Sequence, residues 1–255
     1  MERGEIFMKT VKKALAVLDS FTQDIQSQGV TEIAKKLGLH KSTTFYLLST
    51  LREEGYIIYN ADTKKYSLGY KLLDLAGRIQ YRRDLRNLSF PILQELAKVV
   101  EEDIALNIHI EGKRVCIALV ESRCFVRNMV PLGKAMPSHC SAAGKVLMAF
   151  SSKAEIEEII SRCGLPRFTP NTITQKTQLF TKLKEIRTKG YGESRNEFGI
   201  DAAALAFPIF NGKGEILAAL SIQSTVNRLN DETRPKFLKE GLRAAQKINR
   251  LLAEL

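Results

Sequence analysis

Residues 30–55 read VTEIAKKLGLHKSTTFYLLSTLREEG, and residues 56–69 continue YIIYNADTKKYSLG. The apolar spacing of residues 31–37 predicts a short helix, and Gly38 supplies the left-handed residue that ends a helix and turns the chain sharply. A second helix is predicted from Lys41 to Glu54. Two helices joined in this way, with a polar start to the second, are typical of a helix-turn-helix that fits the major groove of DNA.

The first turn of the predicted second helix carries side chains that can donate hydrogen bonds to phosphates or base edges. These are His40, Lys41, Ser42, Thr43, Thr44 and Tyr46. Ser42 also suits a helix cap. The packing face of this helix is expected to consist of Phe45, Leu47, Leu48 and Leu51.

A helix over residues 10–21, with its apolar side chains along one stripe, can close over the other two helices. Residues 56–68 predict a two-stranded hairpin, or wing, because two β-rich segments flank a turn at residues 60–63. Lys64 and Lys65 lie near the tip and are predicted phosphate contacts, with a solvated lysine pair as the alternative. The N-terminal part therefore predicts a winged helix-turn-helix.

Residues 70–86 continue with helical periodicity. Their basic run suits a solvated helix face better than a row of phosphate contacts, and it consists of Arg78, Arg82, Arg83 and Arg86. We expect this segment to be a linker helix between residues 1–69 and a second domain at residues 87–255.

The second domain has an α+β pattern. Strands are expected where apolar residues alternate at 104–110, at 115–120, at 125–130, and on both sides of the turn at 211–214. Helices are expected at 90–100, from the capping box at 152–155 to Gly164, over a segment ending at Gly190, and at 232–254. This order predicts a mainly antiparallel sheet covered by helices.

The bulk properties limit the possible environments and partners. The chain has 255 residues and a net charge of +11, which suits a partner rich in phosphate. Residues 1–80 carry only +3, from 12 Lys and Arg against 9 Asp and Glu, so the motif is the stronger indication of DNA binding. Charges interrupt every apolar stretch well short of about 20 residues, and we expect a cytoplasmic protein without membrane association. The four cysteines form no Cys-x-x-Cys pair, which favours reduced thiols.

The sequence indicates no catalytic site. Gly144 and Lys145 suggest a P-loop, but His139 and Val146 stand where that motif needs Gly and Ser or Thr. His139 and Cys140 are adjacent and are expected to point apart, so a Cys-His nucleophile is disfavoured. A metal site using His109, His139, Asp103 or a cysteine has no specific spacing, and we predict neither metal nor cofactor.

Residues 141–144, Ser-Ala-Ala-Gly, suggest anion binding instead. Small residues at the start of a helix expose backbone N–H groups at its positive end, so a small carboxylate can approach closely.

Two sets of motifs carry a resemblance to a known family. The N-terminal set is GLHKSTTFYLLSTLREEG at 38–55 and KYSLGYKLL at 65–73. The second set is PLG at 131–133, SHCSAAGKVLMAF at 138–150, FTPNTIT at 168–174, GYGESRNE at 190–197, AFPI at 206–209 and AALSI at 218–222. Together they resemble the IclR family of bacterial transcriptional regulators over nearly the whole chain. The resemblance implies a winged helix-turn-helix, a linker helix and a GAF-like effector-binding domain.

The resemblance also implies site residues and partners. By motif, the effector-binding residues are Phe125, Asn128, Met136, Ala142, Ala143, Ser194, Ala202, Ala204, Ser221 and Gln223. The implied partners are a double-stranded DNA operator, a small organic acid or aromatic metabolite, and further copies of the chain in a homodimer or homotetramer. Family members commonly have Arg at the position of Tyr46, and some have Asp at Ser194 and Cys at Ala204. The operator and the effector are therefore expected to differ from those of other members.

Two alternatives remain open from the sequence. One is a metabolite-converting enzyme with an appended DNA-binding domain, and the other is an architectural DNA-binding protein whose core ignores ligands.

Overall fold

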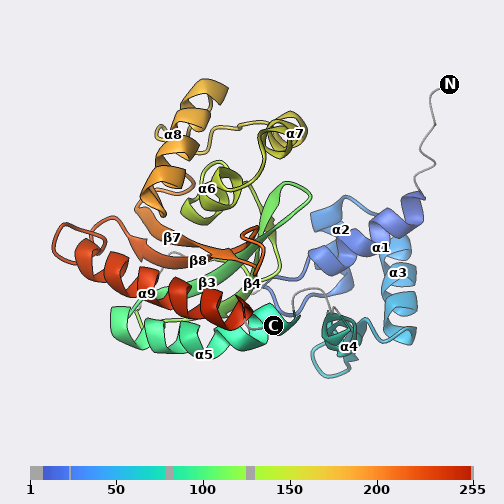
Figure 1. The fold of residues 1–255 in the computed structure, drawn as a ribbon. Coiled ribbons are helices and arrows are strands. Elements are labelled where there is room, and N and C mark those ends of the chain that lie inside the picture. Colours follow the sequence, from blue (N-terminus) through green and yellow to red (C-terminus); the bar gives the residue numbers. More distant parts are fainter. Residues whose placement is uncertain (1–7, 23, 79–82, 125–129, 254–255) are drawn as a thin grey trace. The chain divides into compact units, whose positions relative to one another are not determined.

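The computed structural model describes residues 8–22, 24–78, 83–124 and 130–253. The chain forms two compact units, Met1–Tyr81 and Arg82–Leu255 (Figure 1). Each unit has its own hydrophobic core and is described by itself.

The first unit is a three-helix bundle with a hairpin and one further helix. Its elements are α1 (Lys9–Asp19), α2 (Val30–Leu37), α3 (Lys41–Glu53), β1 (Ile57–Asn60), β2 (Lys65–Leu68) and α4 (Lys71–Gly77). Gly38 ends α2 with φ +63°, as predicted, and the Leu39 N–H donates to the Ala34 carbonyl at 2.9 Å. The strands pair antiparallel from Ile57 opposite Leu68 to Asn60 opposite Lys65. The predicted helix, turn, helix and wing are confirmed.

The inner face of α3 differs from the prediction at one position. Leu47, Leu48 and Leu51 are buried, but Phe45 is 50% exposed, so its expected place in the packing face is wrong. Thr44 takes that place. It lies three, four and seven residues before the buried leucines, which is the spacing of a single helix face.

The second unit is built on a six-stranded sheet. Its elements are α5 (Arg83–Val100), β3 (Asp103–Ile110), β4 (Lys113–Val120), β5 (Ala135–Met136), α6 (Ala142–Ala149), α7 (Lys153–Cys163), α8 (Lys176–Lys189), β6 (Gly192–Arg195), β7 (Ala202–Phe210), β8 (Ile216–Thr225) and α9 (Arg234–Ala253). The strand order is β5-β4-β3-β8-β7-β6, with every neighbouring pair antiparallel.

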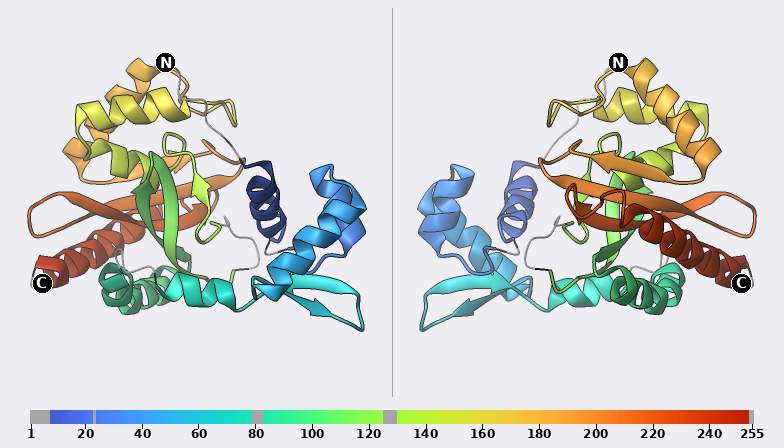
Figure 2. Two further views of the ribbon diagram at one scale, coloured as in Figure 1. Left: turned by 90° about the vertical axis from the view of Figure 1, so that its right-hand side faces the viewer. Right: turned by 90° about the vertical axis from the view of Figure 1, so that its left-hand side faces the viewer.

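Helices cover both faces of this sheet (Figure 2). On one face, α5 and α9 pack on each other and on the side chains of Leu106, Leu220 and Phe207. On the other face, α6 packs on β7 and β8, and α8 packs on α6. Alternation along β3 and its neighbours separates the two cores, because successive side chains point to opposite faces. The α+β fold with an antiparallel sheet is thus confirmed.

Several of the expected elements differ from the structure or lie outside the described residues. The helix expected at 90–100 begins at Arg83, and Leu85 already belongs to the core of the second unit. The expected linker at 70–86 is thus divided between α4 and the start of α5, with residues 79–82 outside the described part, and the linker stays a prediction. Of the strand expected at 125–130, only Val130 lies among the described residues. Strand β6 was not predicted, since its sequence GESR lacks apolar alternation.

Candidate DNA-binding surface and effector cavity

The start of α3 presents polar side chains to solvent in the first unit. His40 precedes the first helical residue with extended backbone angles, φ −65° and ψ 143°, and no side chain caps the helix. The suggested capping role of Ser42 is therefore wrong. His40, Lys41 and Ser42 are exposed, and Tyr46 is 71% exposed. With the positive end of α3 beside them, these groups form a surface suited to an anionic backbone.

Thr44 does not belong to this surface. Its side chain is fully buried, and its hydroxyl donates to the His40 carbonyl at 3.1 Å. A buried hydroxyl with its donor in use cannot reach a base edge, so the expectation that Thr44 contacts DNA is wrong. Thr43, beside it, is half-buried and retains access to solvent.

The two lysines of the wing have different surroundings. Lys64 is exposed and sits in the turn with φ +54°. The Lys65 ammonium lies 3.7 Å from a carboxylate oxygen of Glu32 in α2. Because Glu32 offsets part of the charge of Lys65, Lys64 is the stronger candidate for a phosphate contact.

In the second unit, a cavity of about 40 Å³ lies beside the start of α6. Seven of the predicted effector residues line it, from β5, α6, β6, β7 and β8, namely Met136, Ala142, Ala143, Ser194, Ala202, Ala204 and Gln223. Ser141 caps α6, accepting a hydrogen bond from the Gly144 N–H at 3.1 Å. A side chain at Gly144 would overlap the Ser138 backbone, so only glycine lets the chain before α6 pack this closely.

Ser221 lies behind the cavity wall and not on it. It is fully buried, and its hydroxyl accepts from Asn107 at 3.0 Å and from Gln223 at 2.8 Å. The expectation that Ser221 contacts the effector is therefore corrected to a role in holding Gln223. Phe125 and Asn128 lie outside the described residues.

Sequence reasoning missed three charged residues around this cavity. Arg114 and Glu197 line it, and Lys145 of α6, whose side chain is fully buried, forms an ion pair with Glu197. Burial lowers the pKa of Lys145, although Glu197 opposes that shift, and burial also lowers the pKa of Arg114. The available signal was a charged residue inside an apolar segment, in KRVCIALV for Arg114 and in AAGKVLMA for Lys145.

The cysteines and histidines nearby are not arranged for catalysis. Burial raises the pKa of Cys116 to about 11 and that of Cys140 to about 12, so both thiols stay protonated at neutral pH. The pKa of His139 is lowered by burial, and its Nε2 lies 3.0 Å from the Pro166 carbonyl. All four cysteines are free, two of them buried and two half-buried. Among the described residues, no group of His, Cys, Asp and Glu is placed to hold a metal ion.

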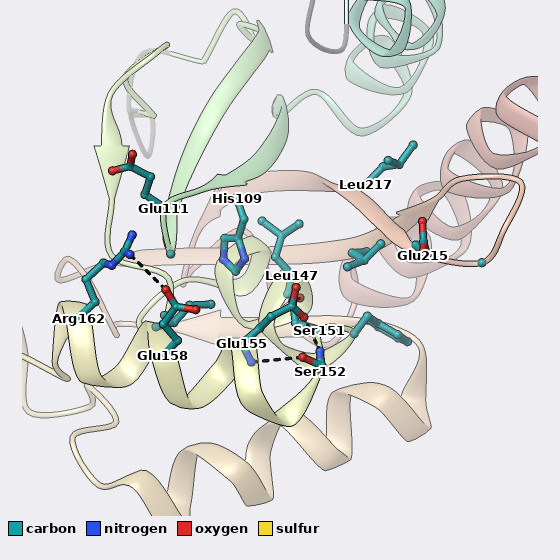
Figure 3. A pocket seen from close by; sticks show the side chains of 15 residues that line it. His109, Glu111, Leu147, Ser151, Ser152, Glu155, Glu158, Arg162, Glu215 and Leu217 are labelled. Atoms are coloured by element: carbon teal, nitrogen blue, oxygen red, sulfur yellow. Dashed lines mark hydrogen bonds and ion pairs between the residues drawn. The ribbon is translucent and has the colours of Figure 1, made fainter.

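A larger cavity, about 690 Å³, contains none of the predicted effector residues (Figure 3). It is lined by α7, the β3–β4 turn, the end of α6 and the start of β8, and its charged lining is mostly acidic. Two of its carboxylates have local partners: Glu155 accepts from the Ser152 N–H at 2.7 Å, and Glu158 pairs with Arg162 at 3.1 Å. Its acidic lining repels organic acids, so the smaller cavity is the better candidate for an anionic effector.

Comparison with known proteins decides the family. Residues 10–61 match the model of the IclR helix-turn-helix domain. Residues 78–250 match the model of the bacterial transcriptional regulator IclR C-terminal domain, which alone covers more than half of the chain. The chain belongs to the IclR family of bacterial transcriptional regulators.

Several IclR-family relatives are similar over most of their length. The transcriptional regulator XynR of Escherichia coli is 29% identical over 96% of this chain and 97% of its own. The regulator KdgR of the same organism is 29% identical, covering 95% of this chain and 92% of its own. The crystal structure of Thermotoga maritima IclR superposes with a TM-score of 0.80 at 29% identity, over 97% of this chain and 100% of that chain.

Membership of the IclR family confirms the predicted class of function. The chain is a DNA-binding transcriptional regulator with an effector-binding C-terminal domain, and not an enzyme. Within the described residues, no helix has the length and apolar character needed to cross a membrane.

Proposed function

We propose that the cavity beside the start of α6 binds the effector that controls operator binding by this regulator. The observation that carries this proposal is the convergence of Met136, Ala142, Ser194, Ala202 and Gln223 on one buried space from five different elements. The positive end of α6 and the small alanine side chains suit a carboxylate that approaches the backbone closely. A small organic acid or an aromatic acid fits this chemistry.

The DNA contacts belong to the first unit in this proposal. His40, Lys41, Ser42, Thr43 and Tyr46 contact the operator, and they do so from the exposed start of α3. Lys64 and, less strongly, Lys65 contact phosphates from the wing. The functional unit is a homodimer or homotetramer in the cytoplasm, since one winged helix with a local charge of +3 binds DNA weakly.

Effector and DNA affect each other reciprocally. If the effector prefers one arrangement of the two recognition helices and the operator prefers another, each ligand lowers the affinity for the other by the same factor. An effector that prefers the arrangement that binds DNA raises both affinities instead.

Ala142→Val tests the location of the effector site. The effector is first found by a thermal-shift screen of small organic acids, sugar acids and phenolic acids, including 4-hydroxybenzoate, which is bound in a solved IclR homologue from Microbacterium hydrocarbonoxydans. Because Ala142 is fully buried and lines the cavity, the larger side chain is expected to weaken calorimetric binding of the best acid at least about tenfold, or by roughly 1.4 kcal/mol.

Ala149→Val is the matched control for this test. Ala149 is buried at the other end of the same helix but does not line the cavity. The valine of this variant therefore causes similar overpacking without blocking the ligand. Equal binding by the wild type and Ala142→Val would show that the acid binds elsewhere.

A further inference from the structure

Arg114 is a buried cation for which the described residues supply no carboxylate. Its side chain is 6% exposed and lines the cavity beside α6. The guanidinium makes one hydrogen bond, from Nη1 to the Asn107 side-chain oxygen at 2.7 Å. Its Nε has no hydrogen-bond partner. Buried arginines are normally paired, because an isolated charge loses its hydration without compensation.

The charges around the cavity leave Arg114 unbalanced. Glu197 is the one acidic residue in the described lining, and Lys145 already neutralises it. Within the described lining, Arg114 therefore leaves one positive charge in excess.

Arg114 is also held firmly in place. Asn107, which accepts its hydrogen bond, donates to Ser221 at 3.0 Å, and Gln223 donates to the same hydroxyl at 2.8 Å. These residues lie on β4, β3 and β8, which are neighbours in the sheet. The network holds the guanidinium on the face of the sheet that carries α6, where Arg114 lines the cavity.

Glu197 has a buried acceptor atom without a hydrogen-bond donor. Its Oε1 pairs with Lys145, while its Oε2 is buried without a partner. Among the described residues, four buried side-chain nitrogen or oxygen atoms lack hydrogen-bond partners. Two of these atoms, Arg114 Nε and Glu197 Oε2, belong to residues that line this cavity. One is a donor on a cation and the other is an acceptor.

We propose that the effector is a small hydroxy monocarboxylate whose carboxylate binds Arg114 and whose hydroxyl donates to Glu197. This inference rests on the proposed effector site and names its ligand class. A carboxylate accepts two parallel hydrogen bonds from the guanidinium fork and balances its charge. A dicarboxylate brings a second charge that nothing in the described lining balances. The 40 Å³ cavity favours an acid of few atoms.

The test is a matched panel of lactate, propionate, lactamide and malonate, with binding measured by thermal shift and calorimetry on the full chain. Lactate is expected to bind most tightly. Propionate lacks the hydroxyl and is expected to bind several-fold more weakly, and lactamide and malonate weaker still. Because a charge-assisted hydrogen bond contributes about 1.5–3 kcal/mol, Arg114→Met is expected to weaken lactate binding about 10- to 100-fold.

A second readout separates ligand binding from a structural role of Arg114. Removing an unbalanced buried charge is expected to leave the melting temperature of the ligand-free protein unchanged or higher, while the stabilisation by lactate disappears. A lower melting temperature with an unchanged preference for lactate over lactamide would overturn the proposal. Arg162→Met is the matched control, because Arg162 is exposed and lies in the other cavity.

The outcomes also distinguish this inference from the proposed site. If Ala142→Val blocks lactate but Arg114→Met does not, the cavity is the effector site and the role of Arg114 is wrong. If neither variant affects lactate binding, both proposals fail. If no carboxylate of the panel binds the wild type, the assignment of the ligand class is wrong.

Discussion

At Lys145 the chain buries an ammonium group within α6, where the side chain has no exposed surface. Glu197 supplies the opposite charge from the segment after β6, and its own side chain is 10% exposed. Thr172 donates to the backbone carbonyl of Glu197 at 2.6 Å, which ties that segment to the loop between α7 and α8. The ion pair thus joins α6 to the loop that carries Glu197, and both line the cavity.

Single and double substitutions test how tightly this pair is coupled. Glu197→Gln or Lys145→Met alone leaves one buried charge unpaired and is expected to destabilise the second unit by about 3–5 kcal/mol. The double variant is expected to recover much of that loss, because no unpaired charge remains. Urea denaturation of the four proteins measures the coupling. Additive losses in the double variant would show that the two charges act independently.

Among the elements, α3 separates its functions by helix face. The buried leucines and Thr44 form one stripe, while Lys41, Ser42 and Tyr46 project from the exposed side. Thr43 and Thr44 are adjacent in sequence, but successive side chains of an α-helix point in directions about 100° apart around its axis. Neighbouring threonines therefore have different roles.

This difference can be measured on DNA selected from random duplexes. Thr43→Ala is expected to weaken binding to the selected sequence by about 1 kcal/mol, roughly fivefold, with a smaller effect on unrelated DNA. Thr44→Val keeps the buried volume and is expected to leave both affinities unchanged. Equal losses on both DNAs in Thr43→Ala would indicate a phosphate contact and not base reading. Weaker DNA binding by Thr44→Val would contradict the conclusion that Thr44 is buried away from the DNA.

On the scale of the whole molecule, α4 leaves two apolar side chains, Leu73 and Leu75, exposed. None of its residues is buried, and Leu73 is 68% exposed. A helix of seven residues is not stable in water by itself, so its apolar side chains call for a further surface. We expect a second copy of the chain to provide it, in line with the proposed dimer.

Leu73→Asp tests this assembly. A charge at an apolar contact is expected to shift the mass in sedimentation equilibrium toward the monomer at micromolar concentration, and to weaken operator binding with it. Leu68→Asp is the control and is expected to leave the mass unchanged. Leu68 is the last residue of β2 and is 43% exposed. An unchanged mass in Leu73→Asp would place the interface between copies elsewhere.

Local sequence determined most of the elements and the family resemblance, and it named most of the residues that line the cavity. Helix ends at Gly38 and Gly190, the capping box at Ser152 and the alternation along β3 depend on neighbouring residues, whose preferences act over a few positions. The family motifs also named Ala142, Ser194 and Gln223, which line one cavity in the structure.

Tertiary structure alone decided which charged groups pair and which side chains are buried. The pairing of Lys145 with Glu197 spans 52 positions, and the contact of Asn107 with Ser221 spans 114, so no local pattern reveals them. The burial of Thr44 and the unbalanced charge of Arg114 likewise depend on what packs around them. Desolvation and charge pairing act through space, and only the folded sheet and its helices bring these groups together.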